Sequence, residues 1–402
     1  MELQKERNLT KKHISFLVLL YSGFIVYALY YSVFGTNAPV MMEHFSITSA
    51  QQGLILTTQG MGALLLSVYL ALHGERYNKI YIAGIGVLIA GGASVAIGFA
   101  PSYTILLLLV VFTGAGYTTF DIMGNGMIPE LFPKQKSTLL PLLHAFFGAG
   151  AMVTPMLVAT MVNPDVPVTF TRPFMIFGIL AIVVIMLFFI VSKRVVPETP
   201  YADMDSVRKR VSESPADIFK EKKAWYILAA SFLYFTYQAG IVSWLPSYCL
   251  EIGMDFSTAG GMLTAYFAGA LIMRFCAPLF LKKLTAHRAY ILFSLLSAAV
   301  ITTALFLTTP VVMTPLLIIG GFMQGACVAF LFLMAFKAFP HRTASASALI
   351  LISINIGSMS APLWMGFIAE FTGYRIPLLL VCGSLALSVA LVFLLTRDSD
   401  KV

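Results

Sequence analysis

Charged residues are scarce in this sequence. Only 11% of its 402 residues are charged and 59% are hydrophobic, whereas a soluble domain carries roughly 25% charged residues. A soluble fold of this length has too little interior to bury so much apolar surface, but a lipid bilayer accepts that surface directly. The composition therefore excludes an ordinary soluble protein and predicts an integral membrane protein.

The sequence also lacks the signatures of several enzyme classes. It has no glycine-rich loop ending in Lys-Ser or Lys-Thr, which excludes a P-loop ATPase, and it shows no nucleophile constellation. Its cysteines fall in apolar segments without the spacing of a metal site or a disulfide framework. They are Cys249, Cys276, Cys327 and Cys382. We expect no enzyme activity, no cofactor and no metal.

Long apolar runs fill most of the chain. A helix that spans a bilayer needs about 20 mostly apolar residues, and twelve segments of this kind lie between charge clusters, prolines and glycines. The predicted spans are 14–39, 49–73, 81–99, 103–128, 137–162, 171–192, 224–249, 257–282, 288–307, 313–336, 343–368 and 376–396. We therefore predict an all-α membrane protein with twelve transmembrane helices.

The cations gather on one side of these spans. If the N-terminus lies in the cytoplasm, 23 of the 26 lysines and arginines fall in cytoplasmic segments. Arg172 and Arg375 fall in outer loops, and Arg274 lies within a span. Because cationic loops resist translocation, we expect both termini in the cytoplasm and the chain in a prokaryotic inner membrane. The net charge of +8 follows this pattern, so we expect contacts with membrane lipids and none with nucleic acid.

The longest connection is charged and divides the chain into two halves. We expect an N-terminal six-helix bundle in residues 1–192, a cytoplasmic linker in 193–223, and a C-terminal six-helix bundle in 224–402. An offset of 207 residues aligns the halves at several positions. It pairs Tyr27 with Tyr234, Pro39 with Pro246, Gly53 with Gly260, Thr57 with Thr264, and Gly114 with Gly321. Parallel six-helix repeats are typical of secondary transporters whose halves rock against each other.

Four stretches resemble a known family. LALHGERYNKI follows the second predicted span, with Glu75 and Arg76 at the acid–base pair of a signature loop. GAGYTTFDIMGNGMIPELF, LLPLLHAFFGAGAMVTP and YFTYQAGIVSWLPSYCLEIGM form the fourth, fifth and seventh spans. The chain resembles the major facilitator superfamily, and within it the fucose permease-like and glucose-type sugar–proton symporters. It departs from them in having no acid in the first span before Glu43 and in having Gln238 where several relatives have an acid.

Asp121 is the most informative polar residue. It lies in the middle of the fourth span, where an ionised carboxylate costs several kcal/mol, so it must be protonated, paired or facing water. The resemblance implies that this acid serves as a protonation site, while the structural alternative is an acid that pins two helices. His144 lies within the fifth span. We expect it to bind the solute or to take part in proton transfer, unless it is a satisfied core residue.

Other mid-span polar and aromatic residues are expected to face a central cavity. Tyr117 and Asn125 lie one helical turn on either side of Asp121 and form a polar stripe with it. The remaining candidates for solute binding are Tyr27, Tyr31, Gln59, Tyr234, Gln238, Trp244, Gln324 and Asn355. The alternative for the amides is hydrogen bonding between helices, and for Trp244 it is an anchor at the membrane interface.

Further charged residues are expected to act as gates or to lie at the outer surface. We predict gating roles for Glu75, Arg76 and Arg274, the last either snorkelling to the cytoplasmic end or pairing with an acid. Glu251 and Glu370 lie near the outer surface and are expected to be solvated loop charges.

The sequence thus favours a monomeric, proton-coupled symporter that carries a sugar or a similar small polar metabolite by alternating access. One alternative is a proton-coupled exporter of drugs or amphipathic metabolites, since the 20 methionines and 32 phenylalanines suit an adaptable cavity. A second alternative is a membrane receptor or scaffold that transports nothing.

Overall fold

The computed structural model describes residues 11–73, 77–132, 135–192, 215–340 and 343–399. Within these ranges the regular structure is helical, and twelve segments are long and apolar enough to cross a membrane. The helices are α1 (Lys11–Phe45), α2 (Ser49–His73), α3 (Lys79–Ile97), α4 (Tyr103–Leu131), α5 (Lys136–Met161), α6 (Thr171–Ser192), α8 (Lys222–Glu251), α9 (Phe256–Leu281), α10 (Ala286–Phe306), α11 (Pro310–Gln324), α12 (Cys327–Ala338), α13 (Thr343–Thr372) and α14 (Arg375–Ser399), with short 3-10 turns at Pro167–Phe170 and Pro215–Lys220. The predicted all-α fold with twelve spans is confirmed.

One predicted boundary is wrong, and one confirmed span consists of two helices. The first span was expected to end at Pro39, but α1 continues through this proline to Phe45, because a proline inside a membrane helix is tolerated where neighbouring groups satisfy the freed carbonyl. The tenth span was expected to be one helix over 313–336. It is instead interrupted at Gly325, where a side-chain Cβ would lie 2.3 Å from the carbonyl oxygen of Ala270 in α9.

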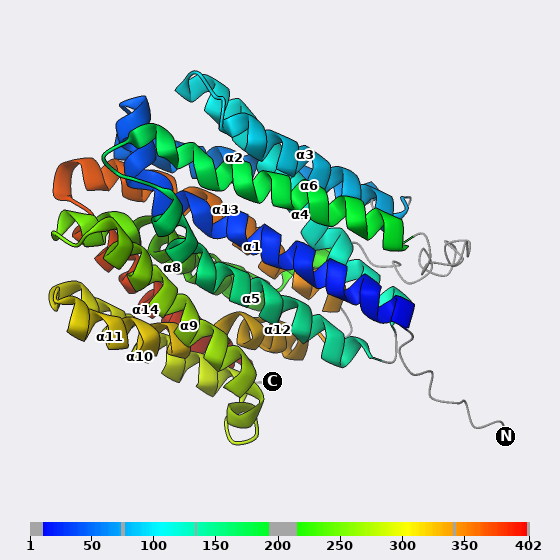
Figure 1. Cartoon of the computed structure of the whole chain (residues 1–402). Helices are drawn as coiled ribbons and strands as arrows, with labels where there is room; N and C mark the ends of the chain where they lie inside the picture. The colour runs from blue at the N-terminus through cyan, green and yellow to red at the C-terminus, as the bar shows by residue number, and fades with distance from the viewer. Residues whose placement is uncertain (1–10, 74–76, 133–134, 193–214, 341–342, 400–402) are drawn as a thin grey trace.

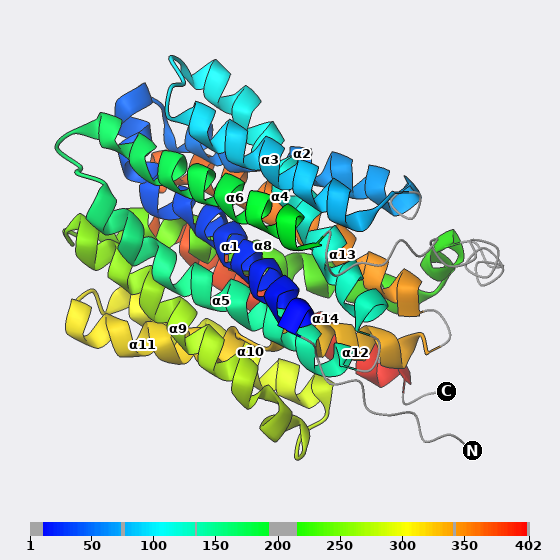
Figure 2. The same ribbon diagram turned by 45° about the vertical axis from the view of Figure 1, so that its right-hand side comes forward.

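Helices pack closely within the first half, as α3 does with α4, and within the second half, as α9 does with α11. The halves meet where α2 packs against α13 and where α5 packs against α9. In both views α3 and α6 lie at one edge of the molecule and α10 and α11 at the opposite edge, with α1, α5 and α8 between them (Figures 1 and 2). Of the expected linker, residues 193–214 lie outside the described residues. The beginning of α1 and the end of α14 lie at the same end of the bundle, which we call the termini end.

Close helix crossings follow the 207-residue offset. A Cβ added to Gly62 of α2 would lie 2.2 Å from the carbonyl oxygen of Val111 in α4. In the second half, a Cβ on Gly269 of α9 would lie 1.9 Å from the carbonyl oxygen of Ile318 in α11. Both members of the second contact stand 207 residues after those of the first. The internal repeat therefore extends from sequence to backbone packing.

The two halves also approach each other closely at the end opposite the termini, which we call the closed end. There a Cβ on Gly53 of α2 would lie 2.3 Å from the carbonyl oxygen of Pro362 in α13. The contact related by the offset joins Gly260 of α9 to the carbonyl oxygen of Pro155 in α5, at 2.9 Å. Only glycine lets the helix backbones approach this closely. The closed end is therefore sealed by two symmetry-related crossings.

Polar bonds reinforce the closed end. A carboxylate oxygen of Glu370 in α13 accepts a hydrogen bond from the Ala50 backbone N–H at the start of α2, at 2.9 Å, where the helix dipole favours a negative charge. Glu251 accepts a hydrogen bond from the Tyr374 backbone N–H at 3.0 Å. The hydroxyls of Tyr374 and Ser49 lie 2.8 Å apart. Glu251 and Glu370 are exposed, as expected, and each also accepts a backbone hydrogen bond.

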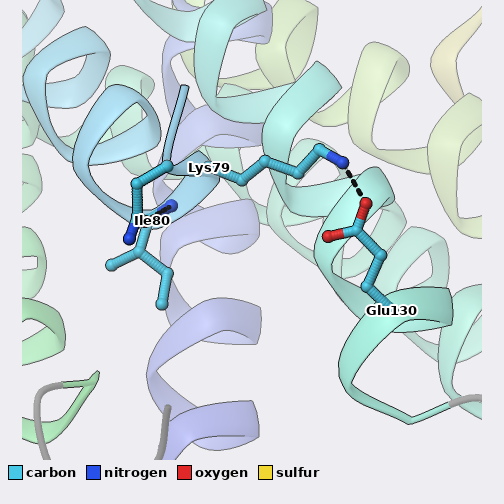
Figure 3. A network of polar contacts seen from close by, with 4 residues as sticks. Lys79, Ile80 and Glu130 are labelled. Atoms are coloured by element: carbon cyan, nitrogen blue, oxygen red, sulfur yellow. Dashed lines mark hydrogen bonds and ion pairs between the residues drawn. The ribbon is translucent and has the colours of Figure 1, made fainter. Parts of the chain in front are cut away.

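One ion pair joins α3 to α4 within the first half, near the termini end. The Lys79 ammonium donates to the Glu130 carboxylate (Figure 3), and the Lys79 side chain is 8% exposed against 47% for Glu130. Lys79 is at the start of α3 and Glu130 is near the end of α4. The Lys79 ammonium therefore faces the partially negative C-terminus of α4, and the Glu130 carboxylate faces the partially positive N-terminus of α3. The pair therefore stabilises the packing of these two helices.

Replacing either of two glycines at the closed end with valine should force the two halves apart at that end. We expect Gly53→Val and Gly366→Val to lengthen the distance between spin labels placed at Asp165 and Thr309, because the carbonyl oxygens of Pro362 and Ser49 occupy the space that each new side chain needs. Electron spin resonance distance measurements on purified protein test this. Gly92→Val is the control, since no atom lies within 4 Å of its Cβ position. Unchanged distances in Gly53→Val and Gly366→Val would contradict this account of the closure.

Candidate functional site

A cavity of about 260 Å³ lies between the two halves, lined by α1, α2, α4 and α5 from the first half and by α8, α9 and α13 from the second. Its lining residues come from the middle of these helices, such as Tyr31 of α1 and Gln238 of α8. The crossings of the closed end seal it on one side. The cavity is therefore central, and it belongs to both bundles.

The cavity follows the internal repeat. Many of its lining positions come in pairs separated by 207 residues. These pairs are Tyr31 with Gln238, Gly35 with Val242, Gly60 with Phe267, Phe147 with Ile354, and Ala151 with Ser358. A ligand in the cavity would therefore contact equivalent faces of both halves.

Six of the predicted solute-binding residues line the cavity. They are Tyr27, Tyr31, Gln59, Tyr117, Gln238 and Asn355. The Gln238 side-chain oxygen is buried and has no hydrogen-bond partner among the described residues. Because buried polar atoms are nearly always satisfied, this oxygen is available to a solute or to water.

Aromatic rings form the wall contributed by the first half. The Tyr27 and Tyr117 rings stack with centroids 5.7 Å apart, and Tyr30 stacks on Tyr117 at 4.6 Å. Tyr30 also lines the cavity. Ser358 lines it too and was not predicted, although it lies three residues from the predicted Asn355 on the same helix face. Helical periodicity was the signal that could have found Ser358.

Tyr234 and Gln324 do not line the cavity, contrary to prediction. They are the repeat counterparts of Tyr27 and Tyr117, but the Gln324 side-chain amide donates to the Tyr234 hydroxyl at 2.6 Å. Both residues are buried inside the second half, at 1% and 3% exposure. The alternative, a hydrogen bond between helices, describes Gln324 correctly.

Trp244 is likewise absent from the cavity, and it is not an interfacial anchor either. It is 1% exposed and stacks on Tyr374, with ring centroids 5.3 Å apart. Its ring packs at the closed end, where Gly366 also lies against it. Trp244 therefore helps to fill the contact between α8 and the end of α13.

Asp121 and Asn125 form a pair one turn beyond the cavity wall. The Asn125 amide donates to a carboxylate oxygen of Asp121 at 2.8 Å and to the Asp121 backbone carbonyl at 2.8 Å. Neither side chain lines the cavity, whereas Tyr117 and Thr118, on the preceding turn of α4, do. The polar stripe exists, but its acid lies behind the cavity on the side of the termini end. The predicted cavity position of Asn125 is therefore wrong in this structure.

Arg274 of α9 reaches across to the first half. It lines the cavity, and its Nη1 donates to the backbone carbonyl of His144 in α5 at 3.2 Å. The guanidinium passes over Gly148, where an added Cβ would lie 2.5 Å from Nη1. His144 itself does not line the cavity, and its ring packs edge-on against Phe24 at 6.5 Å. Arg274 therefore neither snorkels outward nor pairs with an acid.

Two expectations remain, the gating roles of Glu75 and Arg76 and the absence of a metal site. Glu75 and Arg76 lie outside the described residues. In the described part of the chain, no group of three or more His, Cys, Asp and Glu side chains is placed to hold a metal ion.

Replacing Gln324 with leucine should lower the stability of the protein more than replacing Gln59 with leucine does. Gln324→Leu removes the amide that donates to the buried Tyr234 hydroxyl, so we expect a loss of about 1–3 kcal/mol of stability. Gln59→Leu faces the cavity and should leave stability nearly unchanged, within about 0.5 kcal/mol. Thermal unfolding of the purified variants in one detergent tests the difference. Equal effects of the two substitutions would contradict the separate positions of these amides.

Comparison with known proteins identifies the family. The model of the Major Facilitator Superfamily matches residues 19–350 and 251–402. A cis,cis-muconate transport protein of Acinetobacter baylyi is 23% identical over 371 residues, covering 89% of this chain and 86% of that protein. A bacterial homologue of the human lysosomal transporter Spinster, in an inward-facing and unoccupied conformation, aligns with a TM-score of 0.82 at 16% identity, over 97% of this chain and 98% of that one.

The family transporter FucP in its outward conformation also has this fold, with a TM-score of 0.65 at 18% identity over 96% of this chain and 99% of that one. The resemblance predicted from the sequence is therefore confirmed. The chain belongs to the major facilitator superfamily, a family of transporters.

Proposed function

We propose that this chain is a proton-coupled symporter of a sugar or a similar small polar metabolite, and that it works by alternating access. The observation that carries the proposal is the cavity of about 260 Å³ between the halves, closed at one end and lined by amides and tyrosines. Proteins of similar sequence or fold include a muconate transport protein and a fucose:proton symporter. A small polar solute is common to both.

The charge distribution orients the protein. Cations concentrate in the segments at the termini end, so we place this end and both termini in the cytoplasm of a prokaryotic inner membrane. The residues 193–223 then form a cytoplasmic linker between the halves. Because the closed end faces outward, the conformation is inward-facing, and rocking of the halves would exchange the closed end for a closed termini end. The working unit is a monomer, since the cavity is complete within one chain.

Asp121 carries the proton in this proposal. It is a mid-span acid, and an ionised carboxylate in such a position is costly unless it is paired or hydrated. Its one hydrogen-bond partner in the described residues is the neutral amide of Asn125, which leaves its negative charge uncompensated. His144 lies in α5, and its carbonyl accepts a hydrogen bond from the cavity-lining Arg274, so it positions a part of the cavity wall.

The volume and the polar lining of the cavity favour a small polar solute over the larger ligands of a drug exporter. Pockets for drug-sized ligands are typically about 300–1,000 Å³, and this cavity falls below that range. Its amides and hydroxyls suit a polar solute that forms several hydrogen bonds, and its aromatic rings suit the C–H faces of a sugar-like molecule.

Replacing the proposed proton carrier, Asp121, should abolish proton-driven accumulation of the solute but not exchange of the solute across the membrane. We expect Asp121→Asn proteoliposomes to lose accumulation driven by an imposed pH gradient, while exchange of labelled for unlabelled solute persists, because exchange needs no net proton transfer. Glu43→Gln removes an exposed acid and should keep both activities. If Asp121→Asn still accumulated solute with the full response to the pH gradient, the assignment of Asp121 would be wrong.

A further inference from the structure

The cavity carries one positive charge. Arg274 is the charged side chain among the described residues that line it, and no carboxylate of the described chain lies within ion-pair distance of the guanidinium, since the one such pair found there joins Lys79 and Glu130. A charged group inside a membrane protein is expensive and usually marks a functional site. The positive charge in the cavity therefore requires a functional explanation.

The hydrogen bonds of Arg274 are also incomplete. A guanidinium has five N–H donors, and the one hydrogen bond formed by Arg274 in the described structure goes to the backbone carbonyl of His144. The mid-span acid of α4, Asp121, accepts a hydrogen bond from Asn125 and does not line the cavity. The remaining donors of Arg274 are thus available on the side of the cavity.

We infer that the transported solute is a small organic monocarboxylate, held by its carboxylate on Arg274. Arginine binds a carboxylate through two parallel hydrogen bonds, which gives both affinity and orientation. A single guanidinium matches the single charge of a monocarboxylate, whereas a phosphate monoester carries about −1.5 to −2 and would require a second cation in the cavity. This inference rests on the proposed function and narrows its solute from any polar metabolite to an anion.

The rest of the lining fits the remainder of such a solute. The amides of Gln59, Gln238 and Asn355 would bind hydroxyl or keto groups, and the Gln238 oxygen lacks a partner. Phe235 and Phe267 supply apolar contact for the carbon chain. The solute is therefore a carboxylate with polar substituents, of a size that about 260 Å³ admits.

Matched pairs of ligands test the inference on the purified full-length protein. Gluconate, glucuronate, lactate and benzoate are compared with glucose, lactamide and benzamide by thermal shift and calorimetric titration. We expect carboxylates to stabilise the protein and their neutral partners to have no effect. Arg274→Gln should weaken carboxylate binding by roughly 10–100-fold, the effect of losing a charge-assisted hydrogen bond, and Arg274→Lys should retain part of it. Lys282→Gln removes an exposed cation at the end of the same helix and should bind as the unsubstituted protein does.

Any of three binding results would overturn the inference: neutral partners that bind as well as the carboxylates, a panel in which no carboxylate binds, or unaltered carboxylate binding by Arg274→Gln. If Arg274→Gln fails to fold, Arg274→Lys and the comparison of charged with neutral ligands decide the question. Proton-driven uptake of a neutral sugar would sustain the proposed function and overturn only this inference. A carboxylate that binds through Arg274 but never crosses the membrane would support the carboxylate site at Arg274 and overturn the proposed transport function.

Discussion

The contact on which this structure depends is the approach of a glycine to a carbonyl oxygen on a neighbouring helix. Within the halves it sets the crossings of α2 with α4 and of α9 with α11. Between the halves it recurs at Gly53 with Pro362 and at Gly260 with Pro155. At these positions the glycine places no side chain between the two backbones, so the helices can approach closely. Such an interface suits two bundles that separate and meet repeatedly.

The symmetry of the backbone contacts does not extend to the polar side chains in and around the cavity. The backbone contacts repeat with the 207-residue offset, but Asp121 corresponds to Val328 and Arg274 corresponds to Ser67. Tyr27 and Tyr117 stack beside the cavity, whereas their counterparts Tyr234 and Gln324 bond to each other and are buried. The repeated backbone contacts are compatible with two related conformations. The side chains differ: Asp121 of the first half lies one turn beyond the cavity wall, whereas Arg274 of the second half lines the cavity. In the proposed function, Asp121 of the first half carries the proton and Arg274 of the second half binds the anion.

The sequence predicted what depends on hydropathy and periodicity. The twelve spans follow from apolar length, and the cavity positions of Tyr31 and Gln238 follow from their equivalent places in the repeat. It did not predict the burial of Tyr234 and Gln324, because a polar residue in a span bonds equally well to a solute or to another helix, and only packing decides between them. The roles of Glu370 and Arg274 depend on contacts between residues more than 100 positions apart, Glu370 with Ala50 and Arg274 with His144. No local pattern contains that information.

The account makes the closed end a gate that must open in every transport cycle. A Cβ on Gly260 would lie 3.3 Å from the Cβ of Ala159 across the two halves, close to the roughly 3.5–4.5 Å that a disulfide spans. The most direct measurement is uptake by Ala159→Cys/Gly260→Cys proteoliposomes, in a background without the four native cysteines, before and after oxidation. The account predicts that oxidation abolishes uptake and that a reductant restores it, while solute binding in detergent persists throughout. Uptake by the fully cross-linked protein at the uncross-linked rate would contradict alternating access at this end.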